Sequence, residues 1–358
     1  MKNVTNHQRP GVYSVYEASG LTAGKVGGKT VGLVALCTKT GANVPKAGVA
    51  ATYRRYREAA EAFGPEENIA EMVRLLLLNG ASAVVAIPVA AEAGYAKAFT
   101  DLELLEDIAI VLCDSTAAGV QKALQESVNL ASKNRRERVC VLCGAADETV
   151  TNLVARAKVS NDKRCVLAAP GALKPDGTPA HPAHVAAAVA GALAGETDPA
   201  LPLGGATLQG LAGIAISYTD EELDALILGG VTVVESVGGT VAVVRAVTTA
   251  TTTEVGNTPD ATWRELTTIL ITDQVISGLR NALRARFPRA KNTEQSRGAI
   301  RSQVMLELEN RKEREMITGY EGVSVTALPT EPTVCLVEFS FTVAHGLSQI
   351  WLSAHITV

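Results

Sequence analysis

From about residue 100 onward, short apolar runs alternate with stretches whose apolar residues recur at helical spacing. Strands are predicted at 107–114, 138–145 and 164–171, and helices at 116–133, 147–158 and 182–194. Runs that are apolar throughout, rather than at every second position, are typical of strands buried on both faces. The pattern therefore predicts an α/β domain over 101–254, with a parallel or mixed sheet covered by helices on both sides.

The preceding segment, 21–100, has the same character. An apolar strand is expected within 20–46, after a glycine-rich turn. Helices are expected at 53–64 and 68–80, the second ending at Asn79-Gly80, and a strand at 82–90. This region is predicted to be an α/β part that packs with the rest of the core.

The pattern changes after the threonine-rich stretch 249–262, which is the best candidate for a domain boundary. A long helix is predicted over 261–287 and a second over about 295–316. Two strand-like runs, separated at Gly346, follow near the end of the chain. We therefore expect a C-terminal α+β domain over 255–345, so that the chain combines α/β and α+β parts.

The chain starts and ends with strand-like segments, and the first of them has no neighbouring strand in the sequence. Residues 12–16, "VYSVY", follow a Pro-Gly turn, and 346–358 has a similar apolar character. Both segments, 1–20 and 346–358, are predicted to be extended. About twelve extended residues span roughly 40 Å, which is enough to reach another subunit.

Composition excludes several classes of protein. Apolar residues make up 47% of the 358 residues but aromatic residues only 4%, so the cores are expected to be aliphatic. The net charge of −4 argues against a globally basic nucleic-acid binder. The first residues lack the apolar core of a signal peptide, and 184–195 is too short to span a bilayer. Six cysteines, mostly in apolar runs, are expected to be buried free thiols in a reducing cytoplasm.

The strongest enzymatic alternative is a phosphate-binding loop. Residues 23–30, "AGKVGGKT", fit a loose form of that motif, and Asp114 follows an apolar strand as a magnesium-binding partner would. The alternative function is thus a nucleotide-binding α/β protein that uses Lys29, Thr30 and Asp114. However, the run after Thr30 has strand character, whereas a phosphate loop needs a helix N-terminus there.

Other candidate chemistry is weak. Cys140 and Cys143 form a Cys-x-x-Cys pair, but residues three apart in a strand point to opposite faces. His181 and His184 have no acidic cluster beside them. We therefore predict no catalytic residues, metal ligands or cofactor.

A cluster of positive charge distinguishes 280–301, which holds seven Arg or Lys residues and only Glu294 as an acid. Such a stretch is either a solvated helix face or a docking surface for an acidic partner, with salt-dependent association.

Several stretches, in this order, resemble contractile tail sheath proteins of phages and phage-tail-like bacteriocin particles. They are "RPGVY", "VGLVALCTKTGANVP", "MVRLLLLNGASAVVAIPV", "HVAAAVAGALA", "LQGLAGIAISYTDEELDALILGGVTVVE", "WRELTTILITDQVISGLRNALRARF", "GYEGVSV" and "FTVAHGLSQIWLSAHITV". The resemblance covers essentially the whole chain.

The resemblance implies a non-enzymatic structural subunit that forms stacked hexameric rings around an inner tube and contracts by repacking. Its implied partners are further copies of itself, the inner tail tube protein, and baseplate and tail-terminator proteins, with no nucleic acid and no membrane insertion. Assembly would occur in the bacterial cytoplasm, with release by lysis. A plain oligomeric adaptor with arms exchanged inside a closed ring is the remaining alternative.

The resemblance also implies roles for individual residues. The two extended segments, 1–20 and 346–358, would be arms that pair with other subunits. The arm residues would be Val12, Tyr13, Val15, Tyr16, Ile350, Trp351, Ile356 and Val358. The C-terminal domain would lie nearest the tube and present a basic surface made of Arg280, Arg284, Arg286, Arg289 and Lys291.

Overall fold

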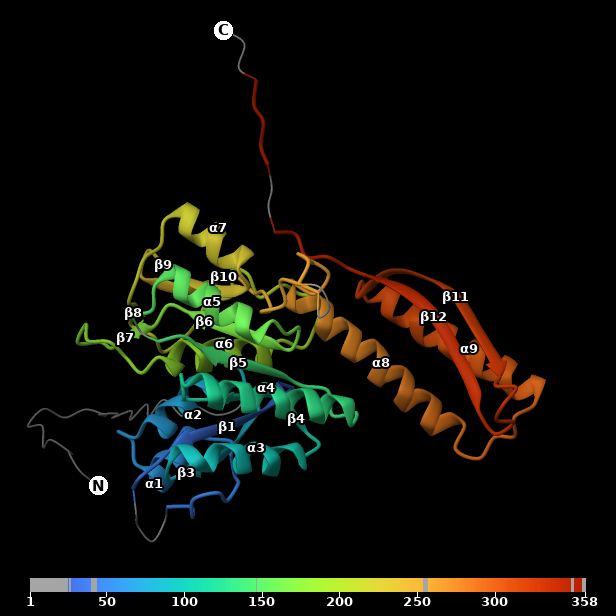
Figure 1. Ribbon diagram of the computed structural model, residues 1–358, viewed down its shortest axis with the longest axis horizontal. Coiled ribbons are helices and arrows are strands. Elements are labelled where there is room, and N and C mark those ends of the chain that lie inside the picture. The colour runs from blue at the N-terminus through green and yellow to red at the C-terminus, as the bar shows by residue number, and fades with distance from the viewer. Residues whose placement is uncertain are drawn as a thin grey trace, which may run out of the picture.

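The computed structural model describes residues 25, 27–39, 44–145, 147–253, 257–348 and 351–355. A large sheet with helices on both faces forms one body, and two long helices with a two-stranded sheet project from it (Figure 1). Beyond β12, residues 351–355 run outward as an extended chain (Figure 1).

The large sheet has eight strands in the order β10-β9-β6-β5-β4-β1-β3-β2. Its strands are β1 (Thr30–Leu36), β2 (Ala51–Tyr53), β3 (Ala83–Val89), β4 (Ile108–Cys113), β5 (Val139–Cys143), β6 (Cys165–Ala169), β9 (Val231–Val237) and β10 (Thr240–Arg245). The six inner strands are parallel, and β2 and β10 are antiparallel edges. The predicted mixed sheet is therefore confirmed.

Helices cover both faces because the inner strands are apolar on both sides. One core packs beneath α1 (Tyr56–Phe63), α2 (Asn68–Asn79) and α6 (Ala183–Gly195). The other packs beneath α3 (Tyr95–Glu103), α4 (Ala118–Lys133), α5 (Val150–Ser160) and α7 (Asp220–Leu228). Helix α6 is buried along most of its length, which explains its alanine-rich sequence.

The projecting part consists of α8 (Leu266–Arg286), α9 (Glu294–Glu313), β11 (Ile317–Ala327) and β12 (Cys335–Val343). Its core is small: the fully buried side chains are Ile271, Val275, Leu279, Val304, Leu308, Met316 and Ile317. The first long helix begins at Leu266, five residues later than the sequence pattern indicated.

Some elements were not predicted from the sequence. They are α3, β2, β11, a short helical turn at Glu92–Gly94, and a two-stranded pair of β7 (Ala172–Leu173) and β8 (Gly213–Ile214). The expected boundary between 21–100 and 101–254 falls inside one sheet. The reason is that β4 pairs with β1, so the two segments share a continuous set of strands.

Candidate functional site

The β11–β12 hairpin is the first candidate surface. Along β12, half-buried and exposed residues alternate without interruption, so one face rests on the small core and the other faces outward. Val337, Phe339, Phe341 and Val343 pack toward that core. The outward residues are Leu336, Glu338, Ser340 and Thr342.

The sheet formed by β11 and β12 has only these two strands in the described chain. Each strand therefore has an outer edge whose backbone groups are not bonded to another strand. An isolated two-stranded sheet is marginally stable, and an open edge is a template for an added strand. The hairpin is consequently suited to accept a further segment.

The chain beyond β12 offers such a segment. The amide of Ala344 still donates to the Met316 carbonyl oxygen at 3.0 Å, after which the backbone leaves the hairpin. Leu347, Trp351 and Leu352 are 77%, 88% and 95% exposed. Of the predicted arm residues only Trp351 is described. Val12, Tyr13, Val15, Tyr16, Ile350, Ile356 and Val358 lie outside the described residues, and their role stays a prediction.

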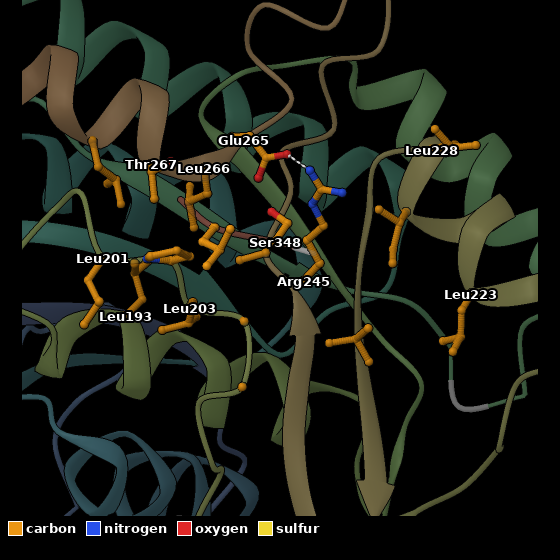
Figure 2. A pocket seen from close by; sticks show the side chains of 18 of the residues that line it. Leu193, Leu201, Leu203, Leu223, Leu228, Arg245, Glu265, Leu266, Thr267 and Ser348 are labelled. Atoms are coloured by element: carbon orange, nitrogen blue, oxygen red, sulfur yellow. Dashed lines mark hydrogen bonds and ion pairs between the residues drawn. The ribbon is translucent and has the colours of Figure 1, made fainter. Parts of the chain in front are cut away.

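A hollow of about 660 Å³ opens where this segment leaves the body, and we call it the α7 hollow. Its lining residues are Leu193, 201–205, Asp220, Leu223, Asp224, Ile227, Leu228, 244–246, 265–267, Leu270, Leu347 and Ser348. Figure 2 shows Leu193, Leu201, Leu203 and Leu266 on one side, Leu223 and Leu228 on another, and an ion pair between Arg245 and Glu265. The hollow thus combines a leucine-rich lining with charged residues.

The predicted basic surface is not uniform. Arg280 Nη2 donates to Glu137 Oε1 at 2.7 Å, which ties α8 to the start of β5. Arg286 bonds the side-chain oxygen of Gln303 on α9. The other three members, Arg284, Arg289 and Lys291, are exposed and form no ion pair within the described residues. Contact of this surface with a tube stays a prediction.

The phosphate-loop alternative does not match the geometry. Lys29 directly precedes β1 and Thr30 is its first residue, so the loop is followed by a strand and not by the helix that a phosphate loop needs. Asp114 follows β4 and lies beside the other end of β1, where its amide donates to the Val34 carbonyl oxygen. Lys29 and Val34 are five residues apart along the extended chain of β1, or roughly 17 Å. The three residues therefore do not converge on one nucleotide, because their strands are parallel and place them at opposite ends of the sheet.

Asp114 instead organises a polar cluster inside the body. Its carboxylate accepts hydrogen bonds from Tyr95 Oη, from Asn68 Nδ2 at 3.2 Å and from the Leu36 amide at 3.1 Å. His184 Nε2 lies 2.9 Å from Asn68 Oδ1, which extends the cluster to α6. Burial lowers the pKa of His184 to about 4. All members have partners, so the cluster joins α2, α6 and β4 rather than presenting a reactive group.

The cysteine pair behaves as the strand geometry predicts. Cys143 belongs to the core on one face of the sheet and Cys140 to the core on the other. Burial raises the pKa of both thiols, which makes them poor nucleophiles. In the described parts of the chain, no group of three or more His, Cys, Asp or Glu side chains is arranged to hold a metal ion. None of the helices described is both long and apolar enough to cross a membrane.

Sequence reasoning missed two features. One is the pair of ionic contacts between α8 and the body, in which Asp273 and Arg280 meet Arg164 and Glu137. Asp273 and Arg280 are seven residues apart on α8, which is a helical spacing, but this spacing does not identify the residues that they bind. The other is the α7 hollow, because its lining comes from segments far apart in the sequence.

Comparison with known families gives two matches that lie one after the other. Residues 90–249 match the family model of the phage tail sheath protein central domain. Residues 258–357 match the model of the phage tail sheath C-terminal domain. Together they cover most of the chain. No curated protein matches the chain by sequence.

Solved structures with a similar fold include a sheath tail protein and chains of the anti-feeding prophage. A chain in the six-fold symmetrised baseplate of the anti-feeding prophage has a TM-score of 0.73 at 14% identity, with coverage of 99% of this chain and 100% of the other. A chain of its contracted helical sheath gives 0.72 at 15%, covering 98% and 99%. The sheath tail protein from Desulfitobacterium hafniense gives 0.68 at 11%, covering 93% and 100%. These likenesses show that the fold is shared.

Proposed function

The chain belongs to the phage tail sheath protein family, and from this premise we propose that it is the repeating subunit of a contractile sheath. Subunits stack as hexameric rings around an inner tube. On a signal from the baseplate they repack and drive the tube through a target envelope. The particle is assembled in the bacterial cytoplasm and released by lysis, and the subunit itself carries out no catalysis.

The observation that carries the proposal is the open-edged β11–β12 sheet beside an exposed apolar C-terminal segment. An arm donated by one subunit adds a strand to the sheet of another. If four or five new backbone hydrogen bonds each contribute about 1 kcal/mol net, one arm adds a few kcal/mol to each contact. Over a long tube these contributions accumulate.

An extended arm also explains how the lattice changes shape without dissociating. The arm stays paired with the neighbouring sheet while the folded bodies rotate and slide against each other. The energy of contraction then comes from a difference in buried surface between two lattices. The separation of Lys29 from Asp114 supports this source of energy over nucleotide hydrolysis.

Other partners follow from the same proposal. The inner tube protein meets the exposed basic residues Arg284, Arg289 and Lys291 at the turn between α8 and α9, while baseplate and tail-terminator proteins meet the two ends of the sheath. The ionic contacts from Asp273 and Arg280 to the body hold α8 in one orientation. Movement of the body is therefore transmitted to the turn.

Electron microscopy of the purified chain tests the proposal. The full chain should form long hollow cylinders, and deletion of residues 1–18 should leave soluble small species. The double variant Trp351→Ala/Leu352→Ala should also reduce cylinder formation. Val159→Ala is a matched control, because Val159 is 80% exposed on α5, away from the hairpin. Unchanged cylinders after the N-terminal deletion would contradict arm exchange.

A further inference from the structure

We infer that the α7 hollow binds the basic leader of the N-terminal arm, residues 1–9, from a second copy of the chain. This inference rests on the proposed arm exchange. It adds a charge-dependent contact to the backbone pairing, on a different part of the recipient subunit.

The hollow has a surplus of negative charge over an apolar lining. Arg245 is already paired with Glu265, so these two charges largely cancel. Asp220 and Asp224 on α7 are exposed and have no ion pair within the described residues. Leu201 and Leu228 in the lining are 54% and 58% exposed. A complementary occupant therefore carries both positive charge and aliphatic side chains.

The N-terminal leader has this composition. Residues 1–9, "MKNVTNHQR", contain Lys2 and Arg9, no acidic residue and the aliphatic Val4. The C-terminal segment 351–355, which is exposed, reads "WLSAH" and contains neither Lys nor Arg. Charge complementarity thus favours the leader over the C-terminal segment as the occupant.

The position of the hollow relative to the hairpin gives the leader a route. Ile317 at the start of β11 pairs with Val343 at the end of β12, so both lie at the same end of the sheet. Four residues later the chain reaches the hollow, where Leu347 and Ser348 line it. Gly346 packs so closely on Pro202 that an added Cβ would lie 2.2 Å from Pro202 Cγ. The hollow is therefore a direct continuation of the hairpin.

One direction of the added strand fits this arrangement. A strand that runs parallel to β11, and therefore antiparallel to β12, begins at the end of the sheet nearest the hollow. This holds whether the strand joins the outer edge of β11 or that of β12. Its preceding residues then extend toward the hollow. The four residues from Val343 to Leu347 span about 13 Å, and the eight from Val4 to Val12 span about 26 Å when extended. The leader is long enough to enter the hollow while residues 12–16 pair with the sheet.

Charge reversal on each side, in the full chain, tests the inference. Asp220→Lys/Asp224→Lys should still form cylinders but should raise the concentration needed for assembly about tenfold, the size expected for two partly exposed ion pairs. Lys2→Glu/Arg9→Glu should likewise form cylinders and raise the concentration needed for assembly about tenfold. Combining all four substitutions should restore assembly toward that of the unmodified chain. Glu221→Lys is the matched control, because it reverses a charge on α7 outside the hollow lining.

The outcomes separate this inference from the proposed function. If neither reversal changes the assembly threshold while deletion of 1–18 abolishes cylinders, arms are exchanged but the leader does not bind the hollow. If the α7 reversal weakens assembly and the combined variant does not recover, the hollow binds another segment and the inference is wrong. If deletion of 1–18 leaves cylinders intact, the proposed function itself fails.

Discussion

Arg164 and Asp273, 109 positions apart in the chain, form a bidentate ion pair at the junction of the two parts of the molecule. Arg164 Nη1 and Nη2 lie 2.6 and 2.8 Å from the two carboxylate oxygens of Asp273, and both side chains are largely buried. Arg164 precedes β6, and Asp273 is on α8. The planar geometry of such a pair fixes the orientation of α8 against the N-terminal end of β6.

The first prediction concerns this pair. Asp273→Ala should lower the free energy of unfolding by about 3 kcal/mol, because it leaves a buried guanidinium without its partner. Burial raises the pKa of Asp273 despite the nearby Arg164, which indicates a large desolvation cost for the pair. The double variant Arg164→Met/Asp273→Leu should therefore be less destabilised than Asp273→Ala. Urea unfolding, with residues 1–18 deleted from each chain, measures the free energy of unfolding of both variants.

A matched control for that experiment is the exposed pair Arg57–Glu61 on α1, whose side chains are 76% and 62% accessible. Glu61→Ala should leave stability almost unchanged, because solvent screens an exposed ion pair. A loss at Asp273 no larger than the loss at Glu61 would show that the buried pair does not hold α8 in place.

The second prediction is a pH dependence at His184. Its pKa is about 4 in the folded chain because burial disfavours the imidazolium, and nearby Glu71 opposes this effect only partly. An unfolded histidine takes up its proton near pH 6.5, so between pH 6.5 and 4 the unfolded state binds more protons. Stability should therefore fall as the pH falls through this window, by about 2 kcal/mol between pH 6.5 and 5 from this group.

His184→Gln is the variant that checks this effect, because glutamine can still donate to Asn68 Oδ1 but does not titrate. Its unfolding free energy should fall less between pH 7 and pH 5 than that of the parent chain. Equal pH dependence of the two chains would show that His184 is not held neutral by burial.

The large sheet was predictable because its signals are local. The strands β3, β4, β5 and β6 are apolar throughout and most helices have an apolar face, so most elements from 68 to 194 were predicted close to their observed bounds. Helix α3 was missed although Tyr95, Ala98, Phe99 and Leu102 follow helical spacing. Strand β11 was missed because Gly319 and Gly322 interrupt its alternation.

The site was less predictable because it depends on contacts between distant residues. The pattern of Asp114 after an apolar run does not reveal that Tyr95 and Asn68 bond its carboxylate, and it favoured a magnesium-binding interpretation. The charge count at 280–301 was correct, but it did not distinguish Arg280, which is paired with Glu137, from exposed Lys291. Exposure and partners come only from the folded arrangement.

The third prediction concerns the contact between α2 and α6. A Cβ on Gly191 would lie 2.7 Å from the Leu76 carbonyl oxygen and 2.8 Å from Asn79 Cβ, so the helices approach too closely for any side chain there. Gly191→Ala should destabilise the body by about 2 kcal/mol through overpacking. Gly298→Ala in α9, where nothing lies within 4 Å of the added Cβ, should instead stabilise by about 0.5–1 kcal/mol. Thermal unfolding of the arm-deleted chain compares the two.

The fourth prediction separates the roles of the basic residues. Arg284→Glu/Arg289→Glu/Lys291→Glu should leave cylinder formation by the purified chain intact, because these side chains have no ion pair within the described residues. The same variant should no longer co-sediment with preformed tubes of its cognate tube protein. Arg280→Gln should retain tube binding and lose stability, since it releases Glu137. Raising salt from 50 to 500 mM should weaken tube binding by the parent chain, because exposed charges are screened. Tube binding by the triple variant at the parent level would show that the exposed basic residues do not face the tube.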